Sequence, residues 1–96
     1  MTTEQLRKPI RWTAHALRSL ADREIAREEA DRTLDAPEFI APGQPPRQIF
    51  MRRYRDAVLQ RDMLLRVVVE EAEDERVVIT VYKTSQIGKY LEGGIA

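Results

Sequence analysis

The stretch that decides the fold is Met63–Lys83, "MLLRVVVEEAEDERVVITVYK", in which two runs rich in β-branched residues flank an acidic turn. We predict strands over Met63–Glu70 and Arg76–Lys83, joined as an antiparallel hairpin by "EAEDE". Matching the apolar faces predicts a register with Val69 opposite Val77, Val67 opposite Ile79 and Leu65 opposite Val81. Of these residues, we expect Val67, Val69, Ile79 and Val81 to be almost fully buried. The other face then pairs Val68 with Val78, Arg66 with Thr80 and Leu64 with Tyr82.

Upstream of this hairpin, Gln48–Arg55 alternates in part and predicts a third consecutive strand, joined to the next by "DAVLQRD". The preceding "PEFIAPGQPP" (Pro37–Pro46) has four prolines and a glycine in ten residues, which predicts a loop within the domain.

The N-terminal part has a helical pattern. Thr13 suits an N-cap, and apolar residues then recur at Ala16, Leu17, Leu20 and Ala21, which predicts a first helix from Ala14 to about Ile25. "AREEADRTL" predicts a second helix that ends before Pro37. "PIRW" (Pro9–Trp12) predicts a short edge strand, and "SQIGKYL" a final helical turn.

These elements predict an α+β fold. We expect two N-terminal helices to pack on one face of a small antiparallel sheet, burying Leu17, Leu20, Ile25 and Leu34. The chain has 96 residues, which we expect to form a single domain over 1–96, with frayed ends at 1–8 and 92–96.

Composition excludes several classes of site. There is no cysteine and only one histidine, so neither a thiolate zinc site nor a histidine-rich metal site is expected, and no cofactor is expected. No apolar run approaches the ~20 residues that span a bilayer, and "MTTEQLRKPI" lacks the apolar stretch of a signal peptide. We therefore expect a cytoplasmic protein without a membrane partner.

The net charge is zero, which does not favour bulk nucleic-acid binding, but the charges are segregated. Segments 22–38 and 70–76 are acidic, whereas Arg47–Arg66 carries six arginines against two aspartates. Arginine outnumbers lysine thirteen to three, and arginine binds phosphate and stacks on bases better than lysine does. A codon bias or a heat-adapted surface would give the same excess.

The polar side of the first predicted helix carries candidate functional residues, among them His15, the one histidine of the chain. His15, Arg18, Ser19 and Asp22 share the side of the first helix away from Leu17 and Leu20. This pattern indicates either an ordinary solvated face or a proton carrier with a pKa near ~6.5 beside arginines that hold a phosphate.

The candidate strand residues are basic and aromatic. Arg52, Arg53, Tyr54 and Arg55 interleave a phenol with guanidinium groups, which suits stacking on single strands or an exposed strand face. Arg66 interrupts "LLRVVV" in a central strand, where a charge needs a partner or a function. A carboxylate such as Asp22 or Glu24 would be a structural partner. Thr80, Tyr82 and Lys83 follow in "VITVYKTS".

Taken together, these motifs resemble a known family: His-x-x-Arg, then Arg-x-Ile, an acidic second helix ending at a proline, "LLRVVVEE" and "VVITVYKTSQIGKYL". The chain looks like a widespread family of small prokaryotic domains of unknown function, commonly grouped with RelE/ParE and BrnT-like toxins. The resemblance spans about Ile10 to Leu91 and implies a RelE-like α+β fold.

The resemblance also implies an activity. In RelE-like ribonucleases, a basic and aromatic set on the sheet positions RNA and helps the ribose 2′-hydroxyl attack the adjacent phosphate without a metal. The matching positions are His15, Arg18, Arg23, Tyr54, Arg66, Thr80 and Tyr82. This chain departs from the family at Glu24-Ile25-Ala26, where members often have Gly then Ile-Ser, and in its neutral net charge, since RelE-like toxins are usually basic.

Two functional hypotheses follow. The first is a toxin-like, metal-independent endoribonuclease, or a degenerate relative of one, with RNA and a cognate antitoxin protein as partners. Its catalytic residues would be His15, Arg18, Arg66, Thr80 and Tyr82, and its RNA-binding residues would be Arg23, Arg52, Tyr54 and Lys83. The second is a non-catalytic protein-interaction module or small regulator, as a homodimer or with another protein, in which Arg66 forms a structural ion pair.

Overall fold

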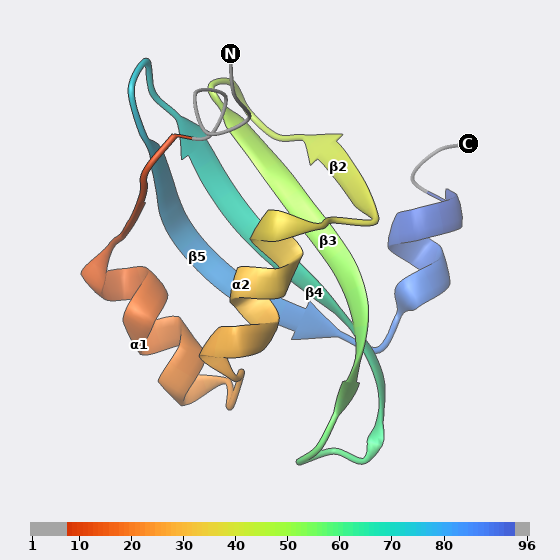
Figure 1. Ribbon diagram of the computed structural model, residues 1–96. Coiled ribbons are helices and arrows are strands. Elements are labelled where there is room, and N and C mark those ends of the chain that lie inside the picture. The colour runs from red at the N-terminus through yellow and green to blue at the C-terminus, as the bar shows by residue number, and fades with distance from the viewer. Residues whose placement is uncertain (1–7, 94–96) are drawn as a thin grey trace.

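Helices α1 and α2 lie side by side in front of a twisted sheet in the computed structural model, which describes residues 8–93 (Figure 1). The sheet has five strands in the order β1-β5-β4-β3-β2. The elements in chain order are β1 (Ile10–Trp12), α1 (Ala14–Asp22), α2 (Arg27–Asp35), β2 (Phe39–Pro42), β3 (Arg47–Asp56), β4 (Arg61–Glu71), β5 (Arg76–Thr84) and the π-helical η2 (Lys89–Gly93). Of the ends predicted to be frayed, 1–8 and 92–96, residues 1–7 and 94–96 lie outside the described residues.

The three central strands confirm the prediction, because β3, β4 and β5 are consecutive and antiparallel. The sheet as a whole is mixed, however, which corrects the expectation of a purely antiparallel sheet. Strand β1 runs parallel to β5, and the Arg76 N–H donates to the Pro9 carbonyl in this pair. Parallel strands need a long connection between them, and here two helices and three strands separate β1 from β5 along the chain.

The segment predicted as a loop over Pro37–Pro46 contains a strand, which is the second correction. Phe39–Pro42 forms β2, which pairs antiparallel with β3 at the edge of the sheet. Proline is tolerated there because an edge strand leaves half of its backbone groups unpaired. The four prolines of this segment favour a loop in the sequence pattern, although the short run "FIA" has the apolar character of a strand.

The hairpin of β4 and β5 is offset from the predicted register. Arg66 lies opposite Tyr82, Val67 opposite Val81 and Val69 opposite Val78, with a bulge between Val68 and Val69. The offset has two causes. The turn between the strands is one residue shorter than predicted, and Ile79 is an extra, unpaired residue at the bulge. Together they move the partner of Arg66 by two residues, from Thr80 to Tyr82. Ile79 is consequently only partly buried, and its predicted full burial is wrong.

The core lies between the helices and one face of the sheet. Leu65, Val67 and Val69 of β4 point toward the helices and are fully buried. The predicted burial of Leu20, Ile25 and Leu34 is confirmed. Leu17 is 45% exposed, which contradicts its predicted burial, because Ala16 and Leu20 already fill the contact between α1 and the sheet.

The connection from β1 to α1 ties the first helix to the bulge. Thr13 is the N-cap of α1, as predicted, and its Oγ1 accepts from the Ala16 N–H at 3.0 Å. The same hydroxyl donates to the Val78 carbonyl at 2.9 Å. One side chain therefore caps the helix and fixes it to β5.

The junction between α1 and α2 contains two residues that fit their positions poorly. Glu24 has a positive φ of 54°, the left-handed region that favours glycine. Ala26 is the N-cap of α2 and has no side chain that can cap the helix. These are the positions at which the resembled family often has Gly and Ser, so the sequence departs from that family where the backbone geometry would use those residues.

Candidate functional site

Strand alternation divides the predicted site residues between the two faces of the sheet. Arg52, Tyr54 and Lys83 lie on the face that α1 and α2 cover, in register with Leu65 and Met63 of β4. Arg66 and Tyr82 lie opposite each other on the other face, which we call the rear face. The predicted catalytic and RNA-binding residues therefore do not form one site.

The predicted residues on or beside α1 are on the surface. His15, Arg18 and Arg23 are exposed, and none of the three has a side-chain hydrogen bond or ion pair with another described residue. Thr80 contacts α1, since its Oγ1 lies 3.3 Å from Ser19 Oγ. The structure thus places Thr80 near the helix that carries His15, while Arg66 points to the rear face.

Arg66 is the centre of the rear face. The residue is 9% exposed, and its Nη1 donates to Tyr82 Oη at 2.6 Å. Its guanidinium carbon lies 3.9 Å from the centroid of the Tyr90 ring and 4.9 Å from that of Tyr82. Both rings present π-electrons to the cation, which is favourable and stronger when water is excluded.

The charge of Arg66 has no counterion among the side chains that the structure describes, those of residues 8–91. No carboxylate there forms an ion pair with it, and its buried Nε makes no hydrogen bond. The structural partners proposed from the sequence, Asp22 and Glu24, do not pair with it. Burying a charged group without a counterion costs free energy, so an anion in contact with this guanidinium would be strongly favoured.

Two further arginines lie toward one end of the rear face. Arg53 is in register with Leu64 and makes a bidentate contact with Glu38, at 3.1 and 2.9 Å. These hydrogen bonds, first from the Arg53 side chain and then from its backbone N–H, lower the pKa of the Glu38 carboxyl to about 2. Arg55 and Asp62 form an exposed pair at 3.5 Å.

A shallow cavity of about 380 Å³ opens beside these arginines, and it is lined by Arg53, Tyr54, Arg55, Asp62 and Ile87. Ile87 precedes Tyr90 by three residues, so the cavity borders the C-terminal segment that contacts Arg66. The rear face therefore combines a buried cation, two tyrosines and two surface guanidinium groups. This composition suits an anionic, aromatic ligand.

On the helix-covered face, the remaining predicted residues are held in ion pairs. Lys83 Nζ lies 2.6 Å from Asp56 Oδ2, and the Tyr54 hydroxyl donates to the same oxygen at 2.9 Å. The backbone N–H groups of Val58 and Leu59 donate to Asp56 Oδ1. Arg52 pairs with Glu29 of α2 at 3.2 Å. These contacts fix α2 and the β3–β4 turn to the sheet.

The network around Asp56 shifts two pKa values. Burial raises the pKa of the Asp56 carboxyl, but the hydrogen bonds from Lys83, Leu59 and Tyr54 outweigh burial and lower it to about 2. Burial, followed by the hydrogen bond to Asp56, raises the pKa of the Tyr54 phenol above its usual range. Tyr54 therefore stays protonated and Asp56 ionised, as a structural network requires.

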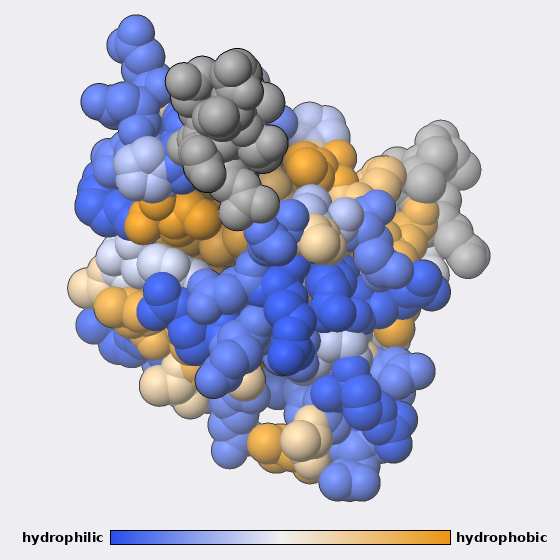
Figure 2. Space-filling view, viewed as in Figure 1, coloured by the Kyte–Doolittle hydropathy of each residue, from blue (hydrophilic) through white to orange (hydrophobic). Residues whose placement is uncertain are grey.

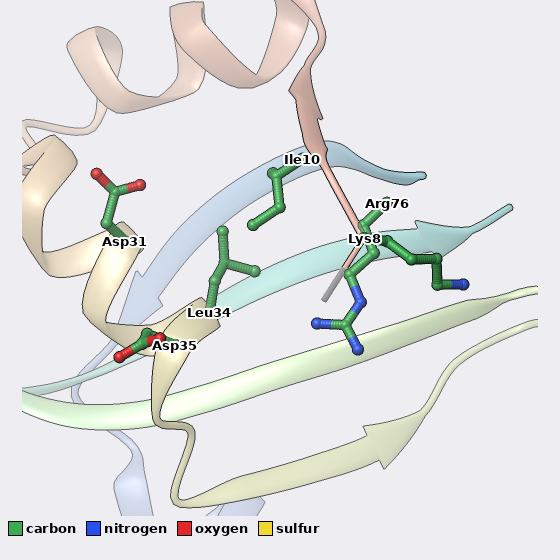
Figure 3. Close-up of a pocket in the computed structure, with 6 residues that line it drawn as sticks. All are labelled: Lys8, Ile10, Asp31, Leu34, Asp35 and Arg76. Carbon is green, nitrogen blue, oxygen red and sulfur yellow. The ribbon is translucent and has the colours of Figure 1, made fainter. Parts of the chain in front are cut away.

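A second cavity has a volume of about 460 Å³ and lies between α2 and the strands β1 and β5. Figure 3 shows Asp31 and Asp35 on the α2 side, Lys8 and Arg76 opposite, and Ile10 and Leu34 between them. Its charges are mostly in pairs: Asp31 with Arg27, and Lys8 with Glu71. Arg76 Nε lies 3.0 Å from Glu71 Oε2, at an angle that makes no hydrogen bond.

Sequence reasoning missed Tyr90 and Asp56. Tyr90 lies in the predicted helical turn, but no local spacing relates a C-terminal tyrosine to an arginine in β4. Asp56 is the first residue of the predicted connection "DAVLQRD". An aspartate that accepts a hydrogen bond from the backbone N–H two residues later, here that of Val58, is an ordinary turn signal. That signal could have found the turn, although not the contact with Lys83.

The described part of the chain shows neither a cluster of metal ligands nor a membrane-spanning helix. Among the described side chains of residues 8–91, no three from His, Asp or Glu lie close enough together to hold a metal ion. The helices of that region are also too short or too polar for any of them to cross a membrane.

The fold and the rear face define a small α+β domain with two helices on one side of its sheet and a basic, aromatic site on the other. Residues 12–83 match the family described as a domain of unknown function (DUF4258), so the chain belongs to that family. No curated protein and no solved structure matches the chain. Tyr90 lies outside the matched residues.

Proposed function

We propose that this protein binds RNA on the rear face and acts as a RelE-like, metal-independent endoribonuclease, or is a degenerate relative that has kept the binding. The observation that carries the proposal is the Arg66 guanidinium, which is buried and has no carboxylate partner among the described side chains of residues 8–91. Support also comes from the tyrosines beside it and from the resemblance to RelE-like domains. A cognate antitoxin partner and a cytoplasmic location belong to the same proposal.

In this mechanism Arg66 holds the scissile phosphate. The ribose 2′-hydroxyl loses its proton to solvent and attacks phosphorus, while the bond from phosphorus to the 5′ oxygen breaks. Arg66 stabilises the negative charge that grows on the phosphate oxygens, which is usually the largest catalytic effect. The Tyr82 hydroxyl accepts a hydrogen bond from Arg66 and so keeps its own proton for the departing 5′ oxygen.

His15 has no part in this mechanism. It lies on α1, and the sheet separates that helix from the Arg66 guanidinium. The surface arginines Arg53 and Arg55 extend the proposed RNA path along the rear face toward the β3–β4 hairpin. Their exposure allows contacts with neighbouring phosphates, which position the strand without reading its sequence.

The test is cleavage and binding of RNA in a chelator. Arg66→Lys keeps the charge but removes the planar fork, so we expect binding to weaken at least about tenfold and cleavage to fall by about 10²–10³-fold. Arg32→Gln, on the exposed side of α2, is the matched control and should behave as the parent. Far-UV circular dichroism verifies folding. An Arg66→Lys protein that equals the parent would refute the proposal.

A protein-interaction module is the second candidate, and the β3–β4 hairpin favours it. Val58 and Leu59 are exposed at its tip, and the side chain of Asp56 holds their backbone in place. The lower edge of Figure 2, where this hairpin lies, shows hydrophobic atoms beside hydrophilic ones. A folded parent that binds no RNA and self-associates through this tip, with dimerisation lost in Leu59→Asp, would support the module.

A further inference from the structure

Two buried side chains show that the rear face is covered. Met51 lies opposite Arg66 and Leu64 lies two residues before it on β4, and both are almost completely buried. Helices α1 and α2 pack on the other face, and Tyr90, in the chain after β5, contacts Arg66 on the rear face. Figure 1 shows this C-terminal segment set apart from α1 and α2.

The contact of Tyr90 with Arg66 has the geometry of a base on an arginine. The ring centroid lies 3.9 Å from the guanidinium carbon, a stacking distance. Nucleobases stack on guanidinium planes in the same way when proteins bind single strands. With Tyr90 in this position, Arg66 is too buried to reach a phosphate on a strand outside the protein.

We infer that the C-terminal segment 87–93 is an autoinhibitory cap, in which Tyr90 occupies the place over Arg66 that an RNA base would take. The inference rests on the proposed function, because RNA is the ligand that the cap excludes. RNA binding then requires Tyr90 to leave Arg66. The affinity measured for the parent is therefore the affinity of the open form multiplied by the fraction of molecules that are open.

The cap is held by few contacts, which suits a part that opens. Tyr90 is only partly buried, and Lys89 beside it is exposed and lies 5.5 Å from the same ring. Residues 85–93 follow β5 and lie beyond the residues that match the family, so no strand of the sheet includes them. Removing the ring should therefore open the site and leave the helices and the sheet intact.

Three substitutions of Tyr90 test the cap. Tyr90→Ala removes the ring, Tyr90→Leu keeps apolar bulk without the aromatic face, and Tyr90→Phe keeps the stack on Arg66 and is the matched control. We measure binding of a short fluorescein-labelled single-stranded RNA by anisotropy in EDTA. We also measure hydrogen exchange of the Arg66 Nε–H by NMR, which needs no RNA. Breaking a desolvated cation–π contact should tighten RNA binding by about 5- to 30-fold.

We expect tighter RNA binding and faster Nε–H exchange in Tyr90→Ala and Tyr90→Leu, and values near those of the parent in Tyr90→Phe. RNA binding by Tyr90→Leu that is equal to or weaker than that of the parent would overturn the cap while leaving the proposed function standing. Absence of RNA binding in both the parent and the uncapped variants would overturn the proposed function, and the cap with it.

Discussion

The pair of Asp56 and Lys83 should be the most costly ion pair to break. Their side chains are 3% and 12% exposed, and the two charged atoms lie 2.6 Å apart. Asp56→Asn keeps an oxygen for the amides of the β3–β4 turn but leaves the Lys83 ammonium buried without its counterion. Breaking a buried pair in this way costs about 3–5 kcal/mol, out of roughly 5–15 kcal/mol for a domain.

This loss should lower the melting temperature by more than about 12 °C. The assay is urea unfolding of a double-mutant cycle with Asp56→Asn, Lys83→Met and both together, for which we expect a coupling free energy of about 2–3 kcal/mol. The control cycle uses Arg55 and Asp62, whose side chains are 64% and 74% exposed, and should give less than about 1 kcal/mol. Equal coupling in the two cycles would refute the reasoning.

Three more predictions concern pH, the helix junction and the bulge. The pKa of Asp56 is about 2 in the folded protein against a usual 3.8, so its stabilisation is fully present above about pH 3.8 and is lost as the pH falls through 2; acid unfolding curves should show this loss in the parent but not in Asp56→Asn. Glu24→Gly and Ala26→Ser should each raise the free energy of unfolding by about 0.5–1 kcal/mol, through the positive φ and the vacant N-cap, and a lower melting temperature in either would contradict this. Val78→Ala should cost about 2 kcal/mol and Ile79→Ala clearly less, since only Val78 is fully buried; the reverse order in urea unfolding would show that the bulge is misplaced.

Much of the fold could be predicted from the sequence because local patterns encode it. The β-branched runs of β4 and β5, the helical stripe of α1 and the Thr13 cap all depend on neighbours within a few residues. The parallel pairing of β1 depends on a contact more than sixty residues away, and β2 on pairing at an edge beside prolines. No local pattern carries such information.

The candidate site shows the same division. Period-two alternation correctly places Arg66 and Tyr82 on one face, but the two-residue offset of the hairpin decides that they lie opposite each other. A single bulged residue, Ile79, causes half of this offset and cannot be read from a run of valines and isoleucine. The stacking of Tyr90 on Arg66 joins two segments that no spacing relates, so the sequence predicts the cation but not its aromatic cover.

The central claim is that RNA binds at Arg66 on the rear face and not at His15 on α1. An NMR titration of the parent with a short single-stranded RNA in EDTA tests it directly, because the Arg66 Nε–H and the His15 ring give separate signals. We predict that the Arg66 Nε–H and the resonances of Tyr82 and Tyr90 shift on binding, while those of the His15 ring stay in place. Shifts confined to His15, Arg18 and Arg23, with the Arg66 signal unmoved, would contradict the account.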